Sequence, residues 1–200
     1  MIVEIKDVVP IDSGNAVKLK VEIRSAENSE RKQLYISASQ YYDCGRPEAG
    51  EITEELYDRL ESMSQMYDAI RKGAYLLSYS ASNKSNLKRK LISKGISEQN
   101  ASLAVDYLTD KGYIDELSQV KRLILRMADR NKYGKRRIAS ELYAKGYARE
   151  VISEAFDSFE DEIDFEENKK ELVRAKFEGQ NIKDPKVKQK IYSLLRRYGY

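Results

Sequence analysis

The feature that most constrains the fold of this chain is an internal repeat in its C-terminal part. The segment LKRKLISKGI at 87–96 aligns with IASELYAKGY at 138–147, and the alignment continues without a gap into the residues that follow. A third, more divergent copy, IYSLLRRYGY, occupies 191–200. Copies in series predict a tandem array in which each unit buries its apolar face against its neighbours and contacts a long partner at several points.

Two kinds of residue define the repeat, namely apolar residues at helical spacing and a glycine after the helix. The apolar positions predict core residues, and each glycine stands where the chain adopts a left-handed conformation to end a short helix. Each unit is therefore predicted to be three short helices. The repeat-defining residues are Leu87, Leu91, Gly95, Gly112, Tyr113, Asp115, Gly134, Ile138, Leu142, Gly146, Ile191, Leu195 and Gly199.

The first forty residues have a different period. Apolar and charged residues alternate from Val17 to Arg24, which predicts a strand with one solvated face. Polar turns at 12–15 and 26–30 separate this strand from further strands at 2–9 and 33–38. The sequence therefore predicts a three-stranded antiparallel meander, which is too small to be stable alone and needs a helix to pack on. Thr53 is the expected N-cap of that helix.

Together these patterns predict a mostly α fold, in which tandem three-helix repeats form an elongated, curved array behind a small three-stranded antiparallel β-meander. The expected parts are the meander at 1–50, a connecting helix at 51–66, repeat 1 at 67–115, repeat 2 at 116–162 and an incomplete repeat 3 at 163–200.

Composition excludes several classes of function. The chain has no histidine, which removes histidine general bases, histidine-dependent nucleophiles and the commonest metal ligand. Its single cysteine, Cys44, cannot form an intrachain disulfide, so we expect a reducing cytoplasm. Neither a signal peptide nor a membrane-spanning run is apparent. Paired carboxylates leave catalysis formally open, but no pattern places such a pair in a pocket, and we expect neither catalysis nor a cofactor or metal.

The net charge is only +3, but basic and acidic residues are concentrated in separate blocks along the chain. Residues 117–150 contain ten Lys and Arg against three acids, 151–171 contain nine acids against two lysines, and 172–200 contain eight basic residues against two acids. Such blocks are often solvated faces. The functional interpretation is two basic surfaces that suit a polyanion or an acidic protein groove.

Several short motifs carry a resemblance to a known family. They are Lys94-Gly95, the turn Gly112-Tyr113-Ile114-Asp115, the helix start Gly134-Lys135-Arg136-Arg137-Ile138 and the segment GEITEELYDRL at 50–60. In this order and spacing they resemble the RecX family, the modulators of the RecA recombinase. The resemblance covers essentially the whole chain, most sharply 68–160. Two features depart from the family pattern. The sequence stops at Tyr200, directly after the helix-ending glycine of repeat 3, so either the protein lacks the third helix of that repeat or the natural protein is longer, and Asp115-Glu116 stands where two aspartates are common.

The resemblance implies a monomeric regulator that lies in the helical groove of the RecA–single-stranded DNA filament. It would bridge neighbouring protomers and change ATP hydrolysis, strand exchange and filament lifetime, by inhibition in most members of the family. Single- or double-stranded DNA would be contacted directly or through the filament, and no membrane is involved. The sequence leaves the sign of regulation open.

Basic residues recur at similar places in successive copies, which favours a binding role over a merely solvated surface. Lys135, Arg136 and Arg137 begin a helix, where cations oppose the helix dipole and where free backbone N–H groups suit phosphate or carboxylate. The alternative is an autonomous DNA-binding protein that grips phosphates without sequence preference. The candidate contact residues are Lys88, Arg89, Lys90, Lys121, Arg122, Arg126, Lys132, Lys135, Arg136, Arg137, Lys186, Lys188, Lys190, Arg196 and Arg197.

Overall fold

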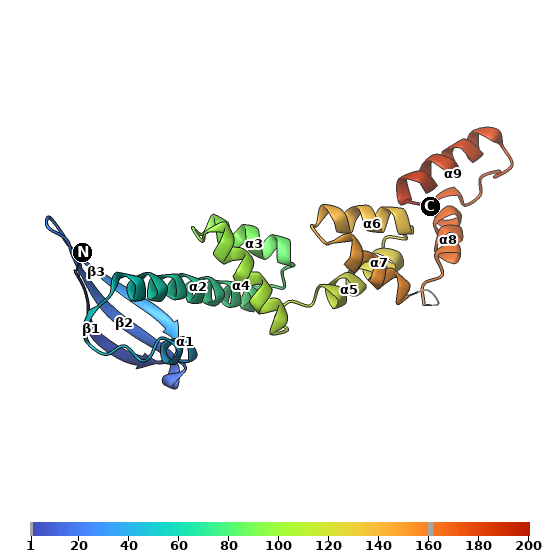
Figure 1. Ribbon diagram of the computed structural model, residues 1–200. Helices are drawn as coiled ribbons and strands as arrows, with labels where there is room; N and C mark the ends of the chain where they lie inside the picture. Colours follow the sequence, from blue (N-terminus) through green and yellow to red (C-terminus); the bar gives the residue numbers. More distant parts are fainter. Residues whose placement is uncertain (1, 160–161) are drawn as a thin grey trace. The chain divides into compact units, whose positions relative to one another are not determined.

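A computed structural model describes residues 2–159 and 162–200, so residues 160 and 161 of the predicted second repeat lie outside the described ranges. The chain divides into two compact units. The first comprises the residues up to 82 together with 87–113, and the second comprises 83–86 together with 114–200. Figure 1 colours the chain along its sequence, from the sheet of the first unit in blue to the last helix of the second unit in red.

An antiparallel sheet of four strands in the order β3-β2-β1-β4 begins the first unit. Strand β1 spans Ile2–Ile11, β2 spans Ala16–Arg24 and β3 spans Ser29–Ser37. The predicted number of three strands is wrong by one, because β4 (Gly50–Ile52) pairs with β1 opposite Val3–Ile5. Three residues are too few to show a period-two pattern. The short helix α1 (Ala38–Asp43), which Ser37 and Gln40 close in a capping box, was also not predicted.

Helix α2 (Glu54–Tyr79) covers one face of the sheet and begins at the predicted N-cap, where the Thr53 side chain accepts from the Leu56 N–H. It runs without interruption through the expected end of the connecting helix at residue 66. Apolar residues from alternate positions of the strands meet α2 in one buried cluster. Its buried members are Val3, Ile5, Val17, Leu19, Val21, Leu34, Ile36, Tyr57 and Leu60.

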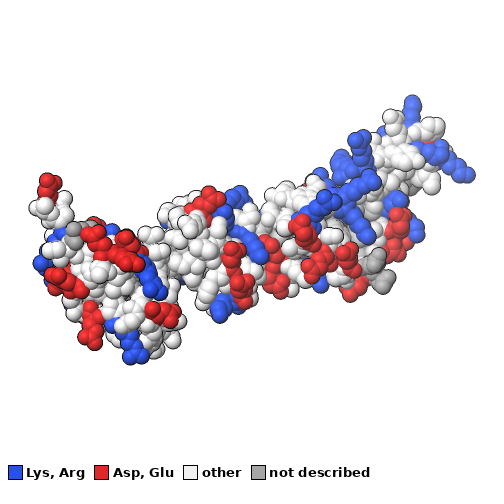
Figure 2. Space-filling model, viewed as in Figure 1, with Lys and Arg blue, Asp and Glu red and all other residues white. Residues whose placement is uncertain are grey.

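The charged residues of the sheet pair with one another, and acidic and basic side chains lie next to each other over this part of the surface (Figure 2). Glu22 is the centre of the network, with its carboxylate 2.7 Å from Arg24 and 3.1 Å from Arg31. Lys6 lies 3.4 Å from the same carboxylate. These hydrogen bonds, from Arg24 first, lower the pKa of Glu22 to about 2.

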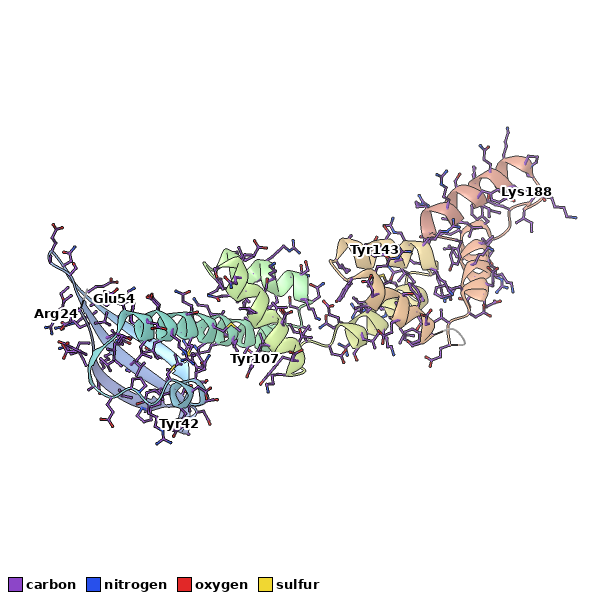
Figure 3. All side chains as sticks on the ribbon, viewed as in Figure 1. Arg24, Tyr42, Glu54, Tyr107, Tyr143 and Lys188 are labelled. Atoms are coloured by element: carbon purple, nitrogen blue, oxygen red, sulfur yellow. The ribbon has the colours of Figure 1, made fainter. Side chains whose placement is uncertain are left out.

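Seven helices follow α2, so the described chain is mostly helical, as predicted. Two of them belong to the first repeat, three to the second and two to the third. Tyr107 on α4 and Tyr143 on α6 are among the exposed large side chains (Figure 3). The helices are α3 (Lys84–Ser93), α4 (Glu98–Asp110), α5 (Glu116–Asp129), α6 (Lys135–Ala144), α7 (Arg149–Asp157), α8 (Phe165–Phe177) and α9 (Pro185–Tyr198).

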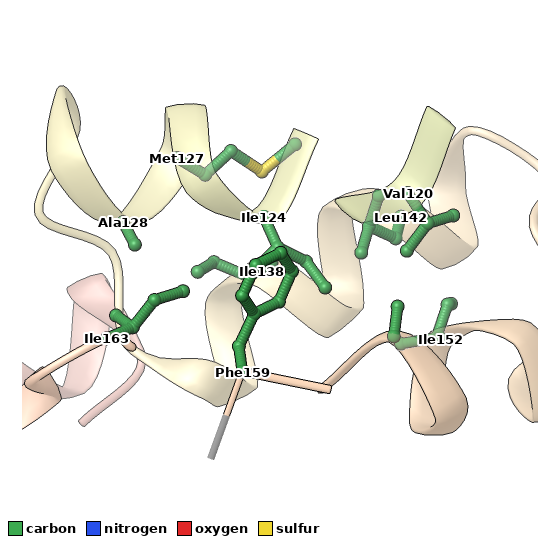
Figure 4. Packing of buried hydrophobic residues seen from close by; sticks show 10 residues of the cluster. Val120, Ile124, Met127, Ala128, Ile138, Leu142, Ile152, Phe159 and Ile163 are labelled. Atoms are coloured by element: carbon green, nitrogen blue, oxygen red, sulfur yellow. The ribbon is translucent and has the colours of Figure 1, made fainter. Parts of the chain in front are cut away.

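The apolar positions of the first two copies are core residues, as the repeat predicts. Leu87 and Leu91 are fully buried, and so are their counterparts Ile138 and Leu142. The cluster of the second repeat draws on α5, α6 and α7 and on the residues after α7 (Figure 4). Its buried members are Val120, Ile124, Met127, Ala128, Ile138, Leu142, Ile152, Ala155, Phe159 and Ile163.

The third copy departs from this pattern. Ile191 and Leu195 are only half-buried, and the fully covered residue of α9 is instead Leu194, at 7% exposure. In the first two copies a third helix closes the unit, whereas no described residues do so for the third copy. The prediction that Ile191 and Leu195 are core residues is therefore wrong in degree.

The glycine that ends each repeated helix has the predicted conformation. The φ angles of Gly95, Gly146 and Gly199 are +83°, +88° and +88°. In the third copy the Tyr200 N–H donates to the Leu195 carbonyl at 3.0 Å and the Gly199 N–H donates to the Arg196 carbonyl at 3.2 Å. These are the two hydrogen bonds of a Schellman cap, and the first two copies make the same pair.

Candidate binding surface around helix α9

The C-terminal end of α9 rests on the N-terminal end of α6. The Gly134 N–H donates to the Tyr198 carbonyl at 2.8 Å, and the Arg136 N–H donates to the Gly199 carbonyl at 3.3 Å. The prediction of free N–H groups at this helix start is therefore wrong for Arg136. The negative end of one helix dipole meets the positive end of the other, which offsets the unfavourable position of the cations on α6.

Glycine is required on both sides of this junction. A Cβ atom on Gly134 would lie 2.5 Å from the Gly199 carbonyl oxygen, and one on Gly199 would overlap the Arg137 backbone. The two backbones approach each other as closely as they do only because neither residue has a side chain. The sequence identified both glycines as repeat-defining but did not indicate that they meet.

A similar junction joins α6 to the start of α3, whose first residues belong to the second unit. The Asn83 side-chain amide donates to the Lys145 carbonyl at 2.8 Å, while its oxygen accepts from the Asn86 N–H at 2.8 Å. Asn83 is buried at 2% exposure. Within the second unit, the end of α6 thus contacts the residues at the start of α3.

Four arginines gather where α9 meets α6. They line a hollow of about 630 Å³, which we call the arginine hollow. Arg137 pairs with Glu141 at 2.6 Å and lies over the Tyr133 ring at 5.6 Å. No carboxylate among the described residues pairs with Arg136 or Arg196. The hollow is lined by Arg136, Arg137, Ser140, Ser193, Arg196, Arg197, Gly199 and Tyr200.

A second hollow, of about 730 Å³, lies between α8 and α9, and we call it the lysine hollow. It shares Ser193 and Arg197 with the arginine hollow, so the two hollows adjoin along α9. Basic side chains dominate this part of the second unit (Figure 2). The lysine hollow is lined by Lys176, Phe177, Lys186, Gln189, Lys190, Ser193, Leu194, Arg197 and Tyr198.

Lys132 and Tyr200 form contacts that connect the segments around the arginine hollow. The Lys132 ammonium lies 2.7 Å from the Glu171 carboxylate and 2.8 Å from Asn168, and it holds the loop before α6 to α8. The same contact lowers the pKa of Glu171. The Tyr200 hydroxyl donates to the Lys132 carbonyl at 3.1 Å, and burial raises the pKa of Tyr200 to about 12, so this donor stays protonated.

The remaining predicted contact residues are spread over both units. Lys88 pairs with Glu98 at 2.9 Å in the first unit, where Arg89 and Lys90 are exposed on α3. Lys135 lies over the Phe165 ring at 5.5 Å. Neither hollow is lined by Lys121, Arg122, Arg126, Lys132, Lys135 or Lys188.

Sequence reasoning did not select several residues of the surface. Lys176 was visible only as part of a charge block, and Gln189 carried no signal. Ser140, Ser193 and Tyr200 enter the hollows because of how α6 and α9 meet, which no local pattern encodes. In the described ranges no cluster of carboxylate and thiol groups could hold a metal ion, and no helix is long and apolar enough to cross a membrane.

Fold and surface together define a helical-repeat protein with an antiparallel sheet before the repeats and an open basic surface at the junction of two copies. No model of a protein family matches the sequence. The chain is 35% identical over 118 residues to the regulatory protein RecX of Xanthomonas axonopodis pv. citri (strain 306), a match that covers 59% of this chain and 71% of that protein. It therefore belongs to the RecX family, whose members are named regulatory proteins.

Other similarities extend over more of the chain. The regulatory protein RecX of Clostridioides difficile (strain 630) is 25% identical over 187 residues, which cover 90% of this chain and 85% of that protein. A crystal structure of regulatory protein RecX has the same fold with a TM-score of 0.73 and 18% identity, over 99% of this chain and 94% of that one. RecX from Lactobacillus salivarius aligns with a TM-score of 0.59 and 19% identity, over 68% and 88%.

Proposed function

We propose that this protein regulates the RecA–single-stranded DNA filament by lying in its groove and slowing ATP hydrolysis and strand exchange. Membership of a family of regulatory proteins supports a regulatory role. The observation that carries the contact is the arginine hollow, in which Arg136 and Arg196 from two different copies line one space without a carboxylate partner. The protein would act as a cytoplasmic monomer, without catalysis or a cofactor.

The chemistry of the hollow suits such a partner. A guanidinium group forms paired, charge-assisted hydrogen bonds to a carboxylate or a phosphate, and a protein–DNA filament presents both. Because neighbouring copies contribute to one hollow, the contact belongs to the junction between repeats, and a series of repeats can follow a long partner. We propose that the other predicted basic residues that line neither hollow contribute to electrostatic attraction at longer range.

The decisive experiment measures RecA ATPase activity on single-stranded DNA at increasing concentrations of this protein. We expect wild type to lower the activity, and the double reversal Arg136→Glu with Arg196→Glu to need about tenfold more protein or higher for the same inhibition. Arg149→Glu with Lys183→Glu is the matched control, because both residues are exposed, line neither hollow and undergo the same change of charge. Equal inhibition by both variants would show that the arginine hollow is not the contact.

Binding to DNA without RecA tests the alternative, an autonomous DNA-binding protein. Direct phosphate binding predicts tight association with a bare oligonucleotide and an affinity that falls steeply as salt is added. A regulator that recognises the filament should bind the bare oligonucleotide far more weakly than the assembled filament. Unchanged RecA ATPase at stoichiometric protein, together with tight and salt-sensitive DNA binding, would favour the alternative.

A further inference from the structure

We infer that the lysine hollow is a second docking site, which takes an acidic protein segment carrying an apolar side chain. The site adjoins the arginine hollow along α9 and shares Ser193 and Arg197 with it, and the inference holds whichever partner the arginine hollow binds. Its floor is apolar and its rim is positively charged. Phe177, Leu194 and Tyr198 supply apolar surface, and the cations are Lys176, Lys186, Lys190 and Arg197.

The cations of the lysine hollow have no carboxylate partner among residues 2–159 and 162–200. No carboxylate lines the hollow, and no ion pair joins Lys176, Lys186 or Lys190 to any described residue. The first two turns of α8 provide the contrast. There Lys169 pairs with Glu166 at 3.1 Å and Lys170 pairs with Glu167 at 3.3 Å. Cations near the start of α8 are neutralised within the helix, whereas Lys176 at its end and the lysines of α9 are left for an external carboxylate.

Helical spacing arranges these cations around the apolar floor. Lys186, Lys190 and Arg197 recur on one side of α9, with Leu194 among them, because positions four and seven residues apart share a face. Lys176 and Phe177 come from the last turn of α8. An apolar centre with a charged rim is the usual arrangement of a protein–protein contact, in which a buried anchor supplies affinity and the rim supplies specificity.

The floor fits a protein segment better than a nucleic acid. Single-stranded nucleic acid is held by aromatic rings whose faces are open for stacking. Tyr198 packs edge-on against Tyr133, with ring centroids 5.6 Å apart, and Leu194 offers no ring. Phe177 is half-buried. An aliphatic or aromatic side chain can fill such a floor while flanking Asp or Glu residues reach the lysines.

A synthetic peptide with Glu and Leu at helical spacing is the direct probe, and fluorescence anisotropy of a labelled copy measures its binding to the full chain. We expect saturable binding that weakens about tenfold or more in the double variant Lys186→Glu with Lys190→Glu. The Lys186→Glu substitution falls in the first turn of α9, where the helix dipole favours an acid, so the variant should fold. Arg149→Glu with Lys183→Glu is the control of equal charge outside the hollow and should bind as wild type does.

Two further probes separate the possible occupants. A peptide with Ser in place of Leu should bind much more weakly, because the floor then contributes nothing. A single-stranded oligonucleotide of equal charge that binds more tightly than the Glu–Leu peptide, and is weakened by the Lys186 and Lys190 reversals, would overturn the inference in favour of nucleic acid. Absence of saturable peptide binding would also overturn it. Because Arg136→Glu with Arg196→Glu should leave peptide binding intact, a failure here is distinct from a failure of the proposed function.

Discussion

The sheet of the first unit and the surface around α9 in the second unit use their cations in opposite ways. In the sheet, the single carboxylate of Glu22 forms ion pairs with Arg24, Arg31 and Lys6. These basic residues therefore stabilise the sheet. Around α9, Arg136 and Arg196 have no carboxylate partner among the described residues. Basic residues of similar number thus stabilise one region and remain available for a partner in the other.

What holds like charges together around α9 is the backbone. The Gly134 N–H and the Arg136 N–H donate to the last carbonyls of α9, and the absence of side chains at Gly134 and Gly199 permits this approach. Repulsion between exposed guanidinium groups costs little in comparison, because water and salt screen it. The backbone hydrogen bonds between α9 and α6 therefore form a scaffold that holds the arginines close together and does not depend on their charge.

The largest effect should come from breaking that scaffold with Gly199→Ala. The substitution places a Cβ atom against the Arg137 backbone at a φ of +88°, so strain and overlap add. We expect the second unit to lose about 3 kcal/mol, measured by hydrogen exchange of the α6 and α9 amides. Gly95→Ala is the control, because its φ is +83° but no atom lies within 4 Å of the added Cβ, and about 1 kcal/mol is expected. Equal losses would mean that the junction contributes no close contact.

A smaller effect should follow from protonating Glu22 in the sheet. The pKa of Glu22 is about 2 in the folded protein against 4.5 in an unperturbed carboxyl, so the folded state binds the proton more weakly. The stabilisation is complete above pH 4.5 and is lost as the pH falls towards 2. We therefore expect the first unit to unfold more readily across this window, and Glu22→Gln to remove this part of the pH dependence. Glu27→Gln, at an exposed turn, should leave the acid-unfolding curve unchanged.

Features that depend on local sequence could be predicted for this chain. Leu91 and Leu142 are buried and Thr53 caps α2, because each of these features depends on residues within a few positions along the chain. The family could also be identified, since its motifs are short and keep their order.

Features that depend on how the copies meet could not be predicted. The meeting of Arg136 with Arg196 depends on a junction between residues sixty positions apart, for which the sequence offers no period. The pairing of the Lys132 ammonium with Glu171 could not be predicted either, because an isolated cation in a sequence does not indicate its partner, and the contact role of Lys132 stays a prediction. Strand β4 is defined only by its pairing with β1.

The smallest expected effect is the change of stability with salt concentration, which should have opposite signs in the sheet and at the α6–α9 junction. Raising salt from about 0.1 M to about 1 M shortens the screening length from about 10 Å to about 3 Å. The sheet should lose stability as its ion pairs weaken, whereas the α6–α9 junction should gain stability as the repulsion among its arginines weakens. Each change should be about 0.5 kcal/mol, and hydrogen exchange resolves the two regions in one sample.

The sign of the salt effect, rather than its size, shows whether the arginines of the hollow repel one another. Arg136→Glu places a carboxylate in the arginine hollow beside Arg196 and Arg197, so added salt should then weaken the junction instead of strengthening it. If wild type and Arg136→Glu respond to salt in the same direction, the arginines do not repel one another measurably. The difference in charge pairing between the sheet and the junction would then have no effect on stability. The electrostatic argument for the arginine hollow as a binding surface would fail.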